Sequence, residues 1–346
     1  MRPLVLLFAS ALVTVNSLAQ DSLKVKPNES ELKQKVWANI FTSFYSTLTG
    51  SNNPGSAFEM PTALLGYSAT LNDRFKATLI YDVTRTTNNI SVIDSLGEPL
   101  NVSYNEGSRY TAFLKMAEIK YSPISFIDLR VGQLLNTQYL TTQDRFWGYR
   151  YIYFTFQEVH RYGNPADFGA QVDLKYQSKF LAQLSVTNGD GPFKQQDSDS
   201  KFLYSLNLEY YPIKGAIVKV YTDISLAPQS ISNGYNRSAL SVFAGFKGDR
   251  SRFAVEYNSV KNYGFTRNSD YWGFSSFLSY TVTSKVDILA RYDYVNRSAP
   301  LNLNGSHFIL TGLHFNPIKN LSCSVNLRRL TAPQKTMLYF SFGANF

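Results

Sequence analysis

The amino-acid sequence predicts an all-β protein, a transmembrane antiparallel β-barrel of about 16 strands, closed by a C-terminal strand that ends in Phe346. Three observations lead to this prediction. Apolar and polar residues alternate with a period of two along most of the chain, and short turns alternate with longer polar loops. The chain is also rich in aromatic residues, yet it has no long apolar segment after its first residues.

The start of the chain has the features of a secretion signal peptide. Arg2 supplies a positive charge, and Leu4 to Val13 form an apolar core that is followed by small residues. That core of about ten residues is too short for a membrane-spanning helix, which needs roughly 20. We therefore expect a signal peptide at residues 1–19, a short periplasmic N-terminal segment at 20–35 and the barrel at 36–346.

The composition suits a membrane barrel. The chain has 24 Tyr and 25 Phe, while its mean hydropathy is −0.20. A barrel produces this combination because only every second residue faces lipid and aromatic girdles lie at both interfaces. An aromatic-rich soluble β-sandwich is the alternative on composition alone. The single cysteine, Cys323, excludes disulfides within the chain, so an extended core or closed hydrogen bonding must stabilise the fold.

Alternation identifies individual strands. Within residues 202–210, one face would carry Phe202, Tyr204, Leu206, Leu208 and Tyr210, and the other Ser205, Asn207 and Glu209. The pattern recurs at residues 252–258, 286–294 and 321–328. In the last of these, Cys323 falls on the apolar face, so we expect a small lipid-facing residue and not a reactive thiol.

In two expected strands, residues 36–48 and 110–121, the alternation of apolar and polar residues is interrupted. In the second, Lys115 and Glu118 lie three positions apart, whereas side chains on one face of a strand lie two or four apart. Both can face the interior only if the strand contains a β-bulge.

Turn residues divide the chain into regular units. Seven short turns are expected at residues 72–73, 122–123, 177–178, 212–214, 248–249, 283–284 and 317–319. Eight longer loops are expected near residues 49–58, 87–108, 133–165, 188–200, 226–237, 261–269, 296–304 and 331–335. Together they would join about 16 strands and leave both chain ends on the periplasmic side.

The last residues predict how the barrel closes. Residues 336–346 alternate with Leu338, Phe340 and Phe342 on one face and end in Phe346. Closure into a barrel would satisfy the strand edges, which have no water to bond within a bilayer. The terminal phenylalanine resembles the signal by which barrel-assembly machinery recognises proteins of the Gram-negative outer membrane. We therefore expect that machinery as a partner and that membrane as the location.

The formal net charge is +9 and its charges are scattered, which argues against nucleic-acid binding. This excess of positive charge could attract anionic solutes or lipopolysaccharide, or it could simply keep the loops soluble. Assigning the polar member of each alternating pair to the lumen gives a wall of mixed sign. Its cations are Lys76, Arg130, Lys175, Lys219, Lys247, Arg252, Arg291 and Arg328, and its acids are Asp82, Asp128, Asp173, Glu209, Asp223, Glu256, Asp287 and Asp293. Such a wall predicts a hydrated pore with little net ion preference.

Three stretches resemble one known family: FIDLRVGQ at 126–133, ADFGAQVDLKY at 166–176 and SVTNGDGPF at 185–193. They are similar to the phosphate-selective porin O and P type. The resemblance implies an outer-membrane channel whose long loop, residues 133–165 here, folds inward as the constriction. It also implies arginines that hold small anions such as phosphate. Assembly stays open between a homotrimer and a monomer.

Arg145, Arg150 and Arg161 are the candidate constriction residues on this loop. Two roles stay open for them: binding of solute, or pairing with Asp144 and Glu158 to hold the loop in place. Two functions also stay open for the protein. It would be either a diffusion pore for small hydrophilic solutes or a non-conducting barrel that serves adhesion or structure.

The sequence contains three histidines, His160, His307 and His314, as candidate catalytic or metal-binding residues. None of them lies in a metal-ligand motif, and no nucleophile elbow or phosphate-binding glycine loop is found in the sequence. We expect no catalytic residue, no metal and no cofactor.

Overall fold

The computed structural model describes residues 32–50, 55–85, 92–93, 99–100, 110–192, 201–228, 231, 233–297, 305–332 and 334–346. The expected signal peptide, residues 1–19, lies outside the described residues, as does most of the expected N-terminal segment at 20–35. The first strand of the barrel begins at Lys33.

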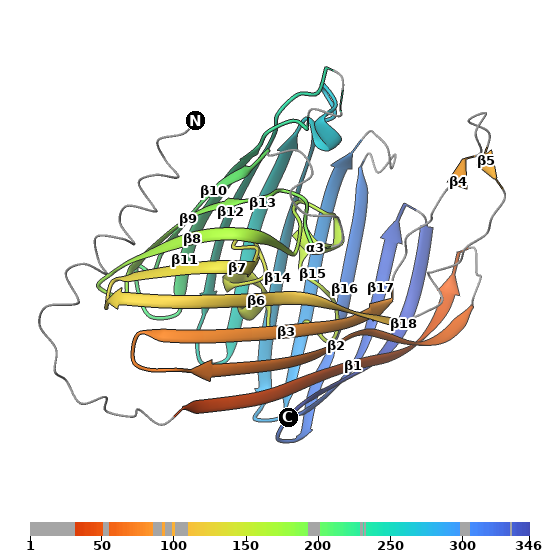
Figure 1. Ribbon diagram of the computed structural model, residues 1–346. Helices are drawn as coiled ribbons and strands as arrows, with labels where there is room; N and C mark the ends of the chain where they lie inside the picture. The colour runs from red at the N-terminus through yellow and green to blue at the C-terminus, as the bar shows by residue number, and fades with distance from the viewer. Residues whose placement is uncertain are drawn as a thin grey trace, which may run out of the picture.

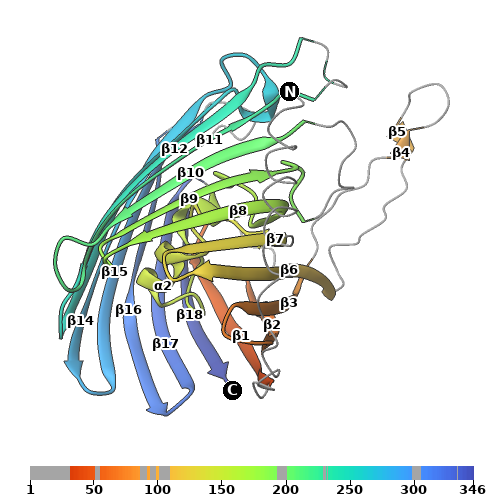
Figure 2. The same cartoon turned by 60° about the vertical axis from the view of Figure 1, so that its left-hand side comes forward.

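Sixteen strands form one closed antiparallel barrel, which confirms the predicted fold class (Figures 1 and 2). The strands are β1 (Lys33–Thr49), β2 (Ser56–Thr70), β3 (Phe75–Arg85), β6 (Tyr110–Ile124), β7 (Ile127–Leu135), β8 (Ala166–Tyr176), β9 (Phe180–Thr187), β10 (Leu203–Tyr210), β11 (Ala216–Ser225), β12 (Arg237–Lys247), β13 (Ser251–Lys261), β14 (Tyr271–Thr283), β15 (Val286–Arg297), β16 (Ser306–Ile318), β17 (Leu321–Thr331) and β18 (Gln334–Asn345). Each strand pairs with its neighbours in sequence order, and β1 closes the ring against β18. In the described part of the chain, no helix is long and apolar enough to span a membrane.

The predicted alternation places side chains as a membrane barrel requires. On β10, Ser205, Asn207 and Glu209 are buried inside, whereas Leu208 and Tyr210 are exposed on the outer face. On β17, the outward face carries Val325 and Leu327 in phase with Cys323. The outer surface is therefore apolar and the inner surface polar, because successive side chains of a strand point to opposite faces.

The expected bulge in residues 110–121 occurs at Lys115. Ile80 of β3 pairs with Met116, but the next residue, Tyr81, pairs with Leu114, so Lys115 has no partner across the ladder. This extra residue shifts the phase of β6, and both Lys115 and Glu118 become buried on the inner side. The loss of alternation in the sequence was thus the signature of a bulge within a strand.

The barrel closes through its last residue. Phe346 and Ala38 of β1 exchange two main-chain hydrogen bonds, with N–O distances of 2.6 and 3.0 Å. The pairing of β1 with β18 runs from Asn39 and Asn345 to Thr49 and Thr336. No edge of the sheet is left open along these described strands, so their main-chain groups are satisfied without water.

Among the described residues, seven short turns lie at one rim of the barrel and connect β2–β3, β6–β7, β8–β9, β10–β11, β12–β13, β14–β15 and β16–β17. The β6–β7 turn lies at residues 125–126, three residues after the expected position at 122–123. Pro123 is tolerated within β6 because it falls at an irregularity of the pairing, between Tyr121 and Ile124, where the ladder needs no donor.

The longer connections that the structure describes lie at the opposite rim. The β3–β6 connection carries a separate two-stranded sheet of β4 (Val92–Ile93) and β5 (Pro99–Leu100), which stands away from the barrel in Figure 1. The β13–β14 connection contains the 3-10 turn η2 (Tyr263–Phe265). The β7–β8 connection, residues 136–165, instead turns into the barrel and carries α2 (Thr142–Trp147), labelled in Figure 2, and α3 (Phe156–Val159), labelled in Figure 1. We call it the inserted segment.

Candidate functional site

The inserted segment packs against one side of the barrel interior. Trp147, Tyr149, Tyr151 and Ile152 form a buried cluster with Phe41 of β1, Leu289 of β15 and Phe308 and Leu310 of β16. A second cluster joins Phe156 and Tyr162 to Ala239, Val260, Tyr271 and Val295 on β12 to β15. The segment thus covers the wall from β12 through β18 to β1 with apolar surface.

Cationic side chains of the wall fasten the main chain of the segment. Lys219 donates to the carbonyls of Thr137 and Gln138, Arg237 to Tyr162, Arg252 to Phe146 and Trp147, Arg291 to Phe154, and Arg328 to Ile152. A buried cation is costly unless it is paired or hydrogen-bonded. Peptide carbonyls of the segment supply these partners, so wall and segment stabilise each other.

These contacts change the expected surroundings of four wall residues. Alternation predicts that Lys219, Arg252, Arg291 and Arg328 face water in the lumen. They do point inward, but the inserted segment covers them. Lys219, Arg291 and Arg328 are buried as a result. Alternation tells which face of a strand a side chain lies on, but not what stands opposite.

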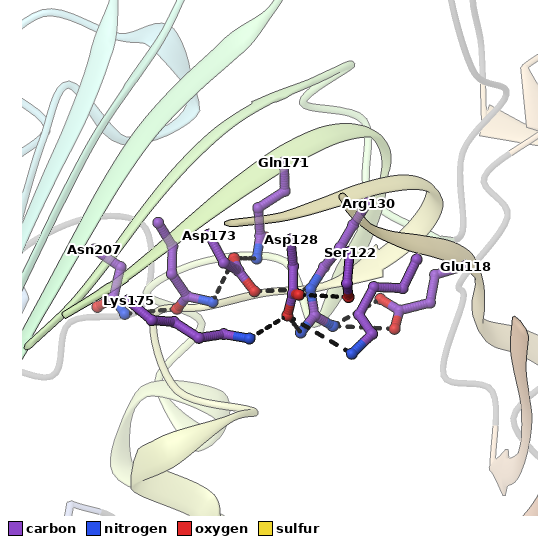
Figure 3. A network of polar contacts seen from close by, with 10 residues as sticks. Glu118, Ser122, Asp128, Arg130, Gln171, Asp173, Lys175 and Asn207 are labelled. Carbon is purple, nitrogen blue, oxygen red and sulfur yellow. Dashed lines mark hydrogen bonds and ion pairs between the residues drawn. The ribbon is translucent and has the colours of Figure 1, made fainter. Parts of the chain in front are cut away.

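The wall formed by β6, β7 and β8 carries a network of ion pairs (Figure 3). Arg130 of β7 lies at its centre. Its guanidinium is 3.0 Å from a carboxylate oxygen of Glu118 on β6 and 2.9 Å from one of Asp173 on β8. Asp173 also accepts hydrogen bonds from Gln171 and Gln183, at 2.6 and 2.9 Å. Neighbouring strands are thereby linked through their inward side chains.

A second group of the same network lies nearer the turns. Asp128 accepts a hydrogen bond from Ser122 at 2.6 Å and pairs with Lys175 at 2.6 Å and with Lys120 at 3.6 Å. Figure 3 shows the Lys175 amino group reaching toward Asp128 from one side and the β6 side chains approaching it from the other. Lys76 lies on β3, opposite Lys120 of β6 in the pairing.

The two signs of charge differ in their access to solvent. The side chains of Arg130 and Lys120 are each 26% exposed and that of Lys175 is 43% exposed. The carboxylates of Glu118, Asp128 and Asp173 are only 6%, 3% and 2% exposed. The formal charges balance, but the surface that this wall presents to the interior is cationic.

A cavity of about 650 Å³ lies toward the rim of the long loops, between the inserted segment and the uncovered wall. On the wall side it is lined by Asp82 and Lys115, which form an ion pair at 2.6 Å. On the segment side it is lined by Arg150 and Glu158, whose charged groups approach to 2.7 Å. A third acid–base pair, Asp223 and Arg237 at 2.8 Å, also lines this opening.

The three candidate arginines occupy different surroundings. Arg150 is largely buried and bonds to Asp144 and to both carboxylate oxygens of Glu158, which corresponds to the holding role that the sequence left open. Arg145 is exposed, and its Nε donates to the carbonyl of Thr141 in its own turn. Arg161 is exposed at the edge of the cavity. Neither Arg145 nor Arg161 forms an ion pair within the described part of the chain.

The pairing with Arg150 determines the charge state of Glu158. Burial disfavours the ionised carboxylate, but the charge and hydrogen bonds of Arg150 outweigh burial and lower the pKa of Glu158 below its ordinary value of 4.5. A lowered carboxylate pKa contributes stability that is present above the ordinary pKa and is lost as the pH falls through the lowered one. The Arg150–Glu158 ion pair, which links two parts of the inserted segment, is therefore intact at neutral pH.

We expect the inserted segment to loosen only in acid. Hydrogen exchange of its backbone amides should be the same at pH 7 and pH 5, after correction for intrinsic rates, and faster below about pH 4. Glu158→Gln should show faster exchange already at pH 7, because a neutral amide is a weaker partner for Arg150 than the carboxylate and leaves only Asp144 to pair with it. Equal protection of wild type and variant at neutral pH would contradict this role of the ion pair.

Some residues of this site were missed by sequence reasoning. Asp82 was assigned to the wall and Lys115 marked the loss of phase, but nothing in the sequence indicated that they meet. Arg237 at the start of β12 was not singled out, although it pairs with Asp223 at 2.8 Å and binds the segment. No group of three or more histidine, cysteine or acidic side chains in the described regions could hold a metal ion.

Comparisons with known proteins connect this architecture to porins. No protein-family model and no curated protein matches the sequence. Salmonella typhi OmpF, solved in complex with daunomycin, matches with a TM-score of 0.65 and 13% identity over 94% of this chain and 100% of that chain. Vibrio cholerae OmpT in a trimer form matches with a TM-score of 0.62 and 11% identity over 91% of this chain and 99% of that chain. A mutant of the Rh. blastica porin matches with a TM-score of 0.58 and 10% identity over 91% of this chain and 100% of that chain.

At these identities the similarity lies in the fold, a closed barrel of 16 antiparallel strands. None of the three matched structures is described as phosphate-selective, so the narrower resemblance seen in the sequence stays a prediction.

Proposed function

We propose that this protein forms a water-filled channel in the outer membrane of a Gram-negative cell, through which small hydrophilic solutes and ions diffuse passively. One observation carries the proposal. Lys120, Arg130 and Lys175 point into the barrel, yet their side chains remain between 26% and 43% exposed. Inward side chains can be exposed only where solvent space lies in front of them. That space lies on the side of the interior which the inserted segment leaves uncovered.

The porin fold and the cavity at the loop rim support the same function. Purified protein in a planar lipid bilayer should produce stepwise increases of current in simple salt solution. A correctly folded barrel that gives no steps would favour the alternative, a non-conducting barrel for adhesion or structure. Folding is checked by heat-modifiable migration in gels and by a β-dominated circular dichroism spectrum.

The finer proposal is a weak preference for anions, set by the β6–β8 wall. Positive and negative charges are paired at the cavity, where Lys115 pairs with Asp82, Arg150 with Glu158 and Arg237 with Asp223. Along β6–β8 the cations are exposed and the acids lie behind them, so a passing ion meets positive charge first. Charges that line a pore act over short distances and are screened by salt. The preference should therefore be clear in dilute salt and small near 1 M.

Neutralising one exposed wall cation should reduce this preference. Lys175→Gln removes the most exposed cation of the network, and we expect the reversal potential in a salt gradient to move toward cation permeability. The matched control is Lys179→Gln, four residues later and exposed in the β8–β9 turn, beyond the end of the strand. A shift of equal size in both variants would contradict selection by the inner wall.

Phosphate as a solute and assembly as a homotrimer are further proposals. Phosphate comes from the resemblance in the sequence, and the homotrimer is supported by one matched porin that is described in a trimer form. Phosphate selectivity predicts that added phosphate reduces the chloride current at a saturable site.

Trimerisation predicts a mass of three chains in detergent, and three equal conductance steps for each insertion event.

A further inference from the structure

We infer that three arginines of the covered wall, Arg252, Arg291 and Arg328, determine the width of the channel from behind, by holding the inserted segment in place. We call them the arginine clamp. The inference rests on the proposed channel, but it concerns residues that lie away from the solvent path. They are positioning residues and do not touch a passing solute.

The clamp binds the main chain of the segment at three successive places. Arg252 of β13 donates to the carbonyls of Phe146 and Trp147, at 3.1 and 2.8 Å. Arg328 of β17 reaches Ile152 at 2.6 Å, and Arg291 of β15 reaches Phe154 at 2.5 Å. The three arginines lie on alternate strands, so the clamp holds residues 146–154 along five neighbouring strands of the sixteen, β13 to β17.

Each guanidinium also lies on an aromatic ring of the same stretch. Arg252 stands 5.3 Å from the ring centre of Tyr149, Arg291 stands 5.3 Å from that of Trp147, and Arg328 stands 4.9 Å from that of Tyr153. A planar guanidinium can stack on a ring and donate in its own plane at the same time, which an ammonium group cannot do. Arginine therefore fits this double contact, and lysine would retain only the donor.

The stretch held by the clamp lies between the covered wall and the cavity. Arg150 falls within residues 146–154, and Arg150 together with Glu158 lines the cavity on the opposite face of the segment. A shift of the clamped stretch toward or away from its wall would move this ion pair across the opening. The distance between Arg150–Glu158 and Asp82–Lys115 thus depends on contacts made behind the segment.

Arg328 and its neighbour Arg329 provide a matched test. Arg328 is buried, and its partner on its own strand is the neutral Asn326, so Arg328→Met leaves no carboxylate unpaired. Arg329 is exposed on the outward face of β17, so Arg329→Met removes the same charge without touching the segment. Arg252→Met and Arg250→Met, the latter in the exposed β12–β13 turn, form a second pair.

We expect Arg328→Met and Arg252→Met to raise the single-channel conductance by up to about twofold and to add transitions between substates, because conductance follows the open cross-section. Both controls should behave as wild type. Arg328→Lys should lie in between, since it keeps a donor and loses the stacking. The reversal potential should stay unchanged in all of these variants, whereas a direct electrostatic role of the clamp would shift it.

A second measurement does not depend on conduction. Trp147 is buried under the clamp, so in a Trp37→Phe, Trp272→Phe background its fluorescence reports the position of the segment. Acrylamide should quench it more strongly in the two clamp variants than in their controls. Conductance and quenching equal to the controls would overturn the clamp. Absence of channel steps in the wild-type protein would instead overturn the proposed function, and the quenching would still test the holding role.

Discussion

Replacing the inserted segment, residues 136–165, by a two-residue Asn-Gly turn is expected to raise the single-channel conductance several-fold. The register of β7 and β8 pairs Leu135 directly with Ala166, so the two strand ends already stand where a tight hairpin turn can join them. The barrel should therefore close as before. Its interior loses the packed clusters that fill the side from β12 to β1 and fills with water instead.

The β3–β6 connection offers a control of the same design. Arg85 pairs with Tyr110, so an Asn-Gly turn can replace residues 86–109 in the same way. The part of this connection that the structure describes, β4 and β5, stands away from the barrel, and its removal should leave the conductance nearly unchanged. An equal rise in both variants, or no rise on removing the inserted segment, would mean that the segment does not narrow the path of ions.

Replacing Phe346 by serine is expected to remove most of the assembled barrel from the outer membrane while leaving the stability of the folded barrel nearly unchanged. The main chain of Phe346 closes the sheet against Ala38, and a serine can form the same two hydrogen bonds. The ring is 68% exposed and adds little packing. A loss of assembly would therefore reflect recognition by the assembly machinery. The measurements are membrane abundance at equal expression and the unfolding temperature of protein refolded in detergent.

Phe342→Ser is the matched control, because Phe342 also lies on the outer face of β18 and is exposed but does not end the chain. It should assemble at a level close to wild type. Equal losses for the two variants would indicate a general need for apolar surface on β18, and no loss for Phe346→Ser would show that the terminal ring is incidental.

The sequence by itself determined which residues form strands and which way they point. The alternation of Ser205, Asn207 and Glu209 with apolar neighbours specified the inner face of β10, because the direction of a side chain on a strand follows from local backbone geometry. The loss of phase at Lys115 specified a bulge for the same reason. The turn and loop rhythm led to the correct number of strands, since each hairpin is signalled within a few residues.

Only the tertiary structure decided what each inward side chain meets. Arg291 and Arg328 find their acceptors in the carbonyls of Phe154 and Ile152, more than 130 residues earlier in the chain. A carbonyl acceptor is present in every residue and leaves no mark in the sequence, and the path of the inserted segment depends on apolar packing across the barrel. The same holds for the exposure of Lys175 in front of Asp128. Local geometry determines the face of a side chain, whereas burial and pairing depend on contacts between distant parts of the chain.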